Sequence, residues 1–204
     1  MARFLHALLR DERAMAAEFA LVLPVLLIFV IGAIDVGYYA WNLNQAEKAT
    51  QVGARFAAVT DPLATEILTT SYVNANVGGS VVTQGDRIPV GAFGELTCTS
   101  TGCTCTTAPC PGTTFDSVAF GRLADRMQNV WPRIADEDIE VTYSGSGLGY
   151  AGNPNGPDIS PIITVRLVDM QYTPLTFTPF GGNLGLPDFS YSLTAEDNSG
   201  QVSN

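Results

Sequence analysis

The sequence predicts an α+β protein. A long N-terminal transmembrane helix is expected to continue into an extracytoplasmic domain with a second helix and an antiparallel sheet. Three observations predict this: an unbroken apolar run from Ala20 to Ile34, helical periodicity over residues 116–134, and strict apolar/polar alternation in three later segments. The 204 residues leave room for one anchor and one modest domain.

The first helix is expected to run from about residue 14 to about residue 60, longer than the roughly 20 residues that span a bilayer. A basic leader over residues 1–13 precedes it with Arg3, Arg10 and Arg13, and the next base is Lys48. This asymmetry predicts a cytoplasmic N-terminus and a C-terminal domain across the membrane. A cleaved signal peptide is the alternative, but the apolar run is long for one and lacks a small-x-small cleavage site after it.

Beyond Ile34 the predicted helix becomes amphipathic, and small residues recur at every fourth position at Ala49, Gly53 and Ala57. Such a ridge allows another backbone to approach closely, as between membrane helices. The alternative is a helix face that packs on its own domain, and both readings stay open. Asp61 and Pro62 are expected to end the helix.

The second helix is predicted from one apolar stripe, with Asp116 as its N-cap and Pro132 near its end. The stripe comprises Phe120, Leu123, Met127, Val130, Trp131 and Ile134. Strands are expected at residues 139–143, 163–167 and 189–195, with one buried and one solvated face. Between them we expect a long flexible loop at 144–156 and an apolar segment at 174–182 that covers the sheet edge or meets a neighbour.

Residues 63–114 are expected to form short strands and loops, among them a hairpin of Val81-Val82 with residues 87–90. Four cysteines follow within thirteen residues, at Cys98, Cys103, Cys105 and Cys110. An even count in an exported domain predicts two disulfides, with three possible pairings, that staple a surface loop over residues 98–110. A zinc site is the alternative, although the usual Cys-x-x-Cys spacing is missing.

Charge is distributed unevenly along the chain. Residues 1–60 are neutral, whereas residues 61–204 hold five bases and fifteen acids and so carry the whole net charge of −10. An acidic domain without a basic stripe argues against nucleic-acid binding. It is also repelled by anionic lipid head groups, so we expect this domain to stand off the membrane.

The residues that enzymes use are scarce in the expected extracytoplasmic domain. The only histidine is His6, in the leader, which excludes a Ser-His-Asp or Cys-His arrangement beyond the membrane. The acidic run of Asp136, Glu137 and Asp138 predicts a solvated turn before a strand. We therefore expect no catalytic residue, no cofactor, no metal site and no enzymatic activity.

A carboxylate lies near the start of the predicted membrane helix. Glu18 precedes Phe19 and the apolar run, and an acidic residue costs about 2.5–3.5 kcal/mol at mid-bilayer and less near an interface. Such a residue normally has a partner. The alternative is a carboxylate at the membrane surface, solvated by head groups and favoured by the positive end of the helix dipole.

The N-terminal residues resemble the type IV pilin-like class, and within it the TadE-like family of tight-adherence (Tad/Flp) pilus assembly. The resemblance lies in residues 16–27, in residues 32–38 and in the segment from Gln45 to Arg55, and more weakly in residues 172–175. It implies a minor pilin or pseudopilin-like subunit in the bacterial inner membrane, with a periplasmic domain. Its implied partners are other pilin-like subunits, the assembly platform and a prepilin peptidase.

The same resemblance implies roles for particular residues. A prepilin peptidase would cut between Arg13 and Ala14, which makes Glu18 the fifth residue of the mature chain. Glu18, with Phe19 beside it, would then pair with the free N-terminal amine of an adjacent subunit and set the register between helices. The residue before such a cut is typically Gly and is Arg13 here, so cleavage and a retained leader both stay open.

Three functional hypotheses follow. The first is a minor pilin or pseudopilin-like subunit that acts by helix packing. The second is a pilus-associated adhesin, for which the Thr-rich cysteine segment would be suited. The third is an anchored periplasmic binding module unrelated to pili, for which any membrane anchor would replace residues 14–34.

Overall fold

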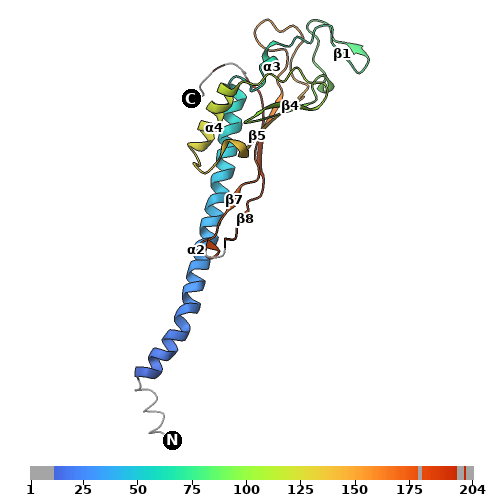
Figure 1. Cartoon of the computed structure of the whole chain (residues 1–204). Helices are drawn as coiled ribbons and strands as arrows, with labels where there is room; N and C mark the ends of the chain where they lie inside the picture. Colours follow the sequence, from blue (N-terminus) through green and yellow to red (C-terminus); the bar gives the residue numbers. More distant parts are fainter. Residues whose placement is uncertain (1–11, 179–180, 197–199, 201–204) are drawn as a thin grey trace. The chain divides into compact units, whose positions relative to one another are not determined.

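The structure is a computed structural model, and it describes residues 12–178, 181–196 and 200 (Figure 1). The leader predicted at residues 1–13 therefore lies outside the described residues except for its last two positions. By their contacts the residues form two compact units. Unit 1 comprises Met1–Asn42 and Gln171–Leu184, and unit 2 comprises Leu43–Met170 and Gly185–Asn204.

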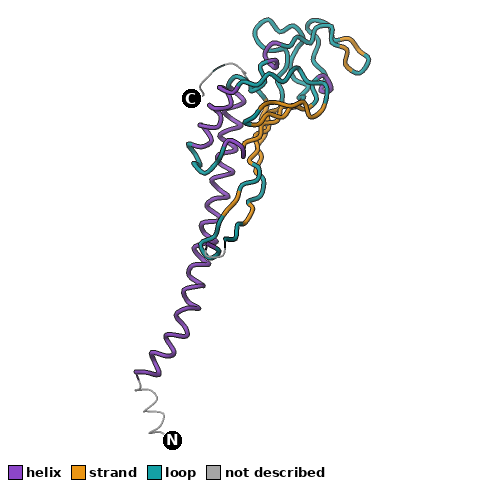
Figure 2. Tube along the Cα trace, viewed as in Figure 1, coloured by secondary structure: helices purple, strands orange, loops and turns teal. Residues whose placement is uncertain are grey.

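One long helix and a series of shorter elements follow each other along the chain (Figure 2). The helices are α2 (Glu12–Val59), α3 (Glu66–Thr69), α4 (Ser117–Gln128) and the 3₁₀ turns η1 (Val90–Ala92) and η2 (Asp136–Asp138). The strands are β1 (Asn76–Val77), β2 (Ser80–Val81), β3 (Glu95–Thr99), β4 (Gly102–Thr107), β5 (Ile139–Ser144), β6 (Ile162–Leu167), β7 (Gln171–Tyr172), β8 (Leu184–Gly185) and β9 (Phe189–Thr194). The predicted α+β class is thus confirmed, as are the first helix and the three later strands.

Unit 2 is built on an antiparallel five-stranded sheet in the order β4-β3-β5-β6-β9. Successive residues of β5 and β6 alternate between buried and partly exposed, as period-two alternation predicts. The C-terminal part of α2 and helix α4 cover the buried face, because Gly53 lies against both Met127 of α4 and Val165 of β6. The largest fully buried side chains of this core include Trp131, Tyr143, Phe93, Ile67, Leu96 and Ile163.

Helix α4 begins where the sequence predicts and ends earlier. The Asp116 carboxylate accepts hydrogen bonds from the amides of Val118 and Ala119, which confirms the N-cap. The helix ends at Gln128, because Pro132 has no amide to donate and disfavours helical geometry at Trp131. Trp131 and Ile134 are still buried, so the predicted stripe belongs to the core although its last part is a turn.

The hairpin predicted between Val81-Val82 and residues 87–90 is wrong. The two-residue turn at Gly78-Gly79, with φ of 60° and 87°, pairs β1 with β2 instead. Arg87 forms a bridge with Tyr150, and its Nε donates to the carbonyl oxygen of Gly147 at 2.7 Å. The loop predicted to be flexible at 144–156 is consequently tied to residues far from it in sequence.

Asp158 holds the far end of that loop. Its carboxylate accepts hydrogen bonds from the amides of Tyr72 (2.8 Å) and Asn153 (2.9 Å) and from the Ser71 hydroxyl (3.3 Å). Burial alone would raise the pKa of Asp158, but the hydrogen bonds from the Gly152, Tyr72 and Asn153 amides outweigh it and leave the pKa below its usual value.

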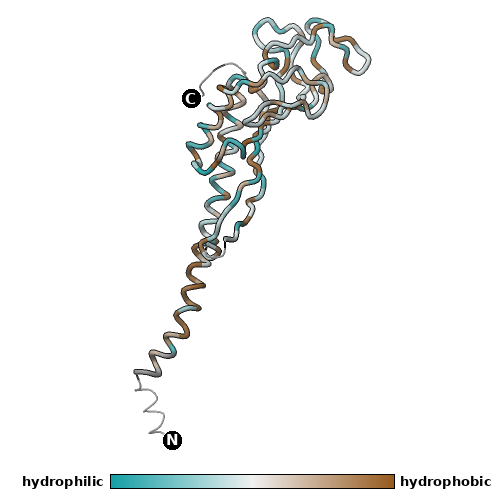
Figure 3. The backbone as a smooth tube through the Cα atoms, viewed as in Figure 1, coloured by the Kyte–Doolittle hydropathy of each residue, from teal (hydrophilic) through white to brown (hydrophobic). Residues whose placement is uncertain are grey.

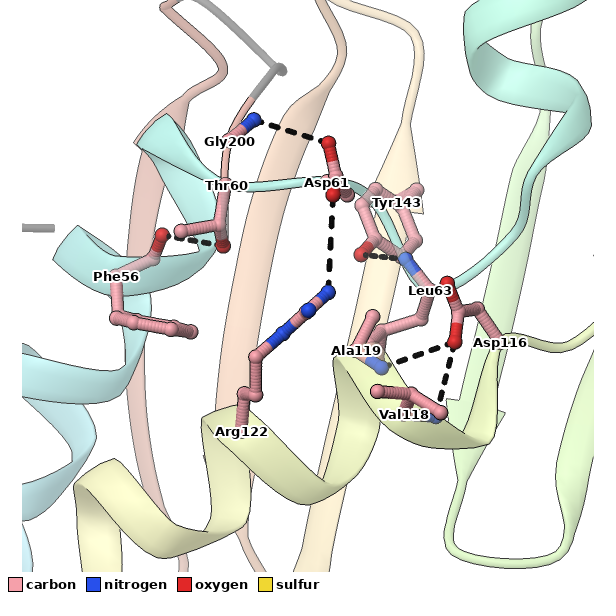
Figure 4. A network of polar contacts seen from close by, with 10 residues as sticks. All are labelled: Phe56, Thr60, Asp61, Leu63, Asp116, Val118, Ala119, Arg122, Tyr143 and Gly200. Carbon is pink, nitrogen blue, oxygen red and sulfur yellow. Dashed lines mark hydrogen bonds and ion pairs between the residues drawn. The ribbon is translucent and has the colours of Figure 1, made fainter. Parts of the chain in front are cut away.

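A polar network fixes the residues that follow α2 in unit 2 (Figure 4). The buried Tyr143 hydroxyl accepts a hydrogen bond from the Leu63 amide at 3.0 Å. Asp61 accepts from the Gly200 amide at 3.0 Å and forms an ion pair with Arg122 of α4 at 3.6 Å. Asp61 and Pro62 do end the helix, as predicted, and the chain that leaves it is bonded to the sheet and to α4.

Candidate membrane anchor and assembly site

The N-terminal half of α2 presents apolar side chains on its whole circumference. The tube of this half of the helix is mostly brown, the colour of hydrophobic residues (Figure 3). Nearly all of the described side chains from Met15 to Ile34 are exposed, and Phe29 is 74% exposed. A helix that is apolar all round needs an apolar environment. Among the described residues, this is the one helix long and apolar enough to cross a membrane, and it fits a single-pass anchored protein.

Glu18 and Phe19 lie at the start of this apolar surface, and both are exposed. Among the side chains that the structure describes, none bonds to the Glu18 carboxylate. The proposed cleavage position between Arg13 and Ala14 lies in the first turn of α2. Pro24 lies inside α2, and the helix continues through it.

Asp35 is the first charged residue after the apolar run, and its side chain is only 7% exposed. Its carboxylate accepts hydrogen bonds from the backbone amides of Leu175 (2.7 Å) and Thr176 (2.9 Å) and from the Thr176 hydroxyl (2.7 Å). The Tyr172 hydroxyl donates to the carbonyl oxygen of Asp35 at 3.2 Å and to Oδ1 at 3.4 Å. We call this set of contacts the Asp35 clamp.

Aromatic packing accompanies the clamp in unit 1. The Tyr172 ring lies 5.7 Å from that of Tyr38 and 5.5 Å from that of Tyr39, and Tyr38 stacks on Trp41 at 5.6 Å. A cavity of about 300 Å³ lies beside the clamp. Its apolar lining comes from α2 and from the segment beginning at β7 that the clamp holds, which we call the clamped segment (residues 171–178 and 181–184). The lining residues include Gly32, Val36, Tyr39, Pro174, Phe177 and Leu184.

The clamped segment is braced internally. The Phe177 and Thr178 amides and the Thr178 hydroxyl all bond to the carbonyl oxygen of Pro174 at 3.1 Å. The Thr173 hydroxyl donates to Asn183 at 2.7 Å, and the Asn183 amide group donates to Gln171 at 3.1 Å. These bonds connect residues 171–178 with residue 183, and Asp35 holds this segment to α2.

The sequence did not reveal this arrangement. Asp35 belongs to the stretch that resembles the TadE-like family, but no role was predicted for it. Two signals were present: a single carboxylate directly after an apolar run, and a 14-residue segment at 171–184 without any charge. Neither signal identifies the other as its partner, because they are more than 130 residues apart in the chain.

The small-residue ridge packs within its own unit. Ala49 and Ala57 are buried, and a Cβ on Gly53 would lie 2.6 Å from the sulfur of Met127. Of the two readings left open by the sequence, the structure shows the helix face that packs on its own domain. Gly53 permits the close approach of α2 to α4.

The four cysteines form two disulfides, Cys98–Cys103 and Cys105–Cys110. The first joins paired positions of β3 and β4, and Cys98 is fully buried. The expected stapled surface loop is therefore an edge hairpin of the main sheet. All four sulfurs are used in disulfides, which leaves none of the thiolates that the zinc alternative required.

The residues that the structure describes contain no group of three or more His, Cys, Asp or Glu side chains placed to hold a metal ion. Asp136, Glu137 and Asp138, expected in a solvated turn, form η2 directly before β5. Burial is the largest influence on the pKa of Asp138 and raises it above the usual value. Its carboxylate accepts a hydrogen bond from the Ala135 amide, a structural contact at the start of η2.

Comparison with known proteins agrees with the resemblance found in the sequence. Residues 14–55 match the family model described as TadE-like protein. No curated protein and no solved structure gave a match. The matched residues lie within α2 and include Glu18, the apolar surface, Asp35 and the first part of the small-residue ridge. The chain thus carries a TadE-like N-terminal segment, which suggests a role related to tight-adherence pili.

Proposed function

We propose that this protein is a membrane-anchored minor pilin or pseudopilin-like subunit in the assembly of tight-adherence (Flp) pili. It lies in the bacterial inner membrane with its N-terminus in the cytoplasm and residues 61–204 in the periplasm. It acts through helix packing and protein contacts rather than catalysis. Its partners are other pilin-like subunits and the assembly platform.

One observation carries this proposal: the TadE-like residues 14–55 coincide with a single continuous helix whose apolar surface begins at Glu18. An acidic residue at that position needs a partner when the helix is surrounded by lipid. None of the described side chains supplies one. A group on a neighbouring subunit is the natural partner, and a free amine at Ala14 is the chemistry that the TadE-like resemblance implies.

The test removes the charge of Glu18 and keeps its shape. In a strain whose pili depend on this chain, we expect Glu18→Gln to abolish fibre assembly while the protein still sediments with the inner membrane. Glu47→Gln is the matched control, because Glu47 is exposed on the same helix outside the apolar run and is expected to retain assembly. Normal fibres with Glu18→Gln would contradict the proposed role of Glu18.

Two further measurements separate the alternatives. The intact mass and N-terminal sequence of the native protein show whether the mature chain starts at Ala14, which supplies the amine, or keeps Met1, which removes it. Replacing residues 14–34 with an unrelated apolar anchor is expected to abolish function. Full function with that anchor would overturn the proposal in favour of an anchored binding module, and recovery of the chain in sheared fibres would favour the adhesin.

A further inference from the structure

The length of the apolar run indicates where α2 leaves the hydrocarbon core of the bilayer. The twenty residues from Met15 to Ile34 span about 30 Å at a rise of 1.5 Å per residue, which matches the hydrocarbon core of a bilayer. Asp35 then marks the outer edge of the core. Tyr38 follows about 4.5 Å further along the axis, within a headgroup layer of about 5–8 Å, and the backbone of Trp41 lies about 9 Å along, at the outer boundary of that layer.

The part of unit 1 at the depth of the headgroup layer has no exposed charged side chain. Residues 36–42 and 171–184 contain no Asp, Glu, Lys or Arg, although residues 61–204 as a whole carry three acids for every base. The one charged group is Asp35, and the donors of the clamp surround its carboxylate. The repulsion from anionic lipids that the acidic domain predicts therefore does not apply to this segment.

The same part exposes large apolar and aromatic side chains. Leu175 is 56% exposed, Phe177 48% and Trp41 47%, and each belongs to a region that contains no charge. Trp and Tyr are enriched at membrane–water interfaces because one part of each ring system is apolar and another is polar. The cavity beside the clamp adds an apolar recess of about 300 Å³ to this surface.

We propose that residues 171–178 and 181–184, together with Val36–Trp41 of α2, form a collar that sits in the headgroup region of the leaflet from which the helix emerges. The occupant of this surface is lipid. The continuity of the collar with the membrane helix, its lack of charge and its exposed aromatic residues support this choice. The Asp35 clamp holds the collar against the helix, so that one carboxylate is hidden and two apolar side chains face the bilayer. This inference rests on the membrane placement of α2 in the proposed function.

The experiment uses tryptophan emission in the full chain, reconstituted in phosphatidylcholine and phosphatidylglycerol vesicles. The lipids are brominated either near the headgroup or near the end of the acyl chain. The native reporter is Trp41, and Trp131 is buried in the protein and serves as a constant background. In a Trp41→Phe background, Phe177→Trp places a second reporter in the collar, and Phe29→Trp places a control reporter in the apolar run.

We expect Trp41 and the Phe177→Trp reporter to lose emission with shallow bromines more than with deep ones. The Phe29→Trp reporter should lose emission most with deep bromines. If only the Phe29→Trp reporter is quenched, the collar is refuted and the anchor stands. If the Phe29→Trp reporter is not quenched either, the membrane placement fails and the collar with it.

A third outcome identifies a different occupant. If the Phe177→Trp reporter is shielded both from bromolipids and from aqueous acrylamide while the Phe29→Trp reporter is quenched, protein covers the collar and the lipid proposal is wrong. Trp41 requires no substitution, so its result stands even where a variant fails to fold.

Discussion

Tyr172→Ala is expected to release the Asp35 clamp. Tyr172 is 1% exposed, and its ring packs on two tyrosines of the helix while its hydroxyl reaches Asp35. Truncating a buried aromatic residue to Ala costs about 3–5 kcal/mol. We take the lower end, because the apolar cavity beside Tyr172 already leaves part of its surroundings unfilled.

The measurable quantity is the hydrogen exchange of the Leu175 and Thr176 amides, both of which donate to Asp35. Exchange of such amides reports the free energy of local opening. A loss of about 3 kcal/mol corresponds to about a hundredfold faster exchange, at about 1.4 kcal/mol per tenfold. The assay is residue-resolved exchange by mass spectrometry or NMR on the full chain in lipid nanodiscs.

Two variants control this prediction. Tyr172→Phe keeps the ring and loses hydroxyl contacts of 3.2 Å and 3.4 Å, which are long for O–H···O hydrogen bonds, so its effect should stay below about tenfold. Tyr150→Ala removes an exposed tyrosine of unit 2 and should leave both amides unchanged. The reasoning is refuted if Tyr172→Ala leaves the exchange unchanged, or if Tyr172→Phe accelerates it as much as Tyr172→Ala.

The remaining predictions concern unit 2. Asp116→Ala removes the N-cap of α4 and should lower the free energy of unfolding by about 1 kcal/mol, measured by urea denaturation. Tyr143→Phe leaves the buried Leu63 amide without its acceptor and should cost about 1–3 kcal/mol in the same assay, and no loss would contradict the hydrogen bond. The pKa of Asp158 is lowered on folding, so its contribution to stability is complete above the unfolded pKa near 3.8 and is lost as the pH falls through the lower folded pKa. The stability difference between the parent and Asp158→Asn should therefore narrow below about pH 4, and a difference that is constant with pH would contradict this assignment.

The sequence by itself determined the elements whose cause is local. The apolar run, the break at Asp61-Pro62 and the alternation in β5, β6 and β9 each depend on neighbouring residues, and all were predicted. The N-cap at Asp116 belongs to the same class, because a carboxylate bonds amides two and three positions ahead of it. The TadE-like segment was also recognisable, since its residues lie on one continuous helix.

Only the tertiary structure decided the pairings between distant residues. Nothing local to Asp35 indicates that its carboxylate meets the amides of residues 175 and 176, since any exposed backbone N–H is an equivalent donor. The small-residue ridge suits packing against a second membrane helix as well as packing against the protein's own domain, and the contacts with Met127 of α4 and Val165 of β6 show the latter. The cysteines allowed three pairings until the register of β3 and β4 placed Cys98 opposite Cys103. In each case, the free energy of folding depends on which surfaces come into contact. The spacing of residues along the sequence does not specify those contacts.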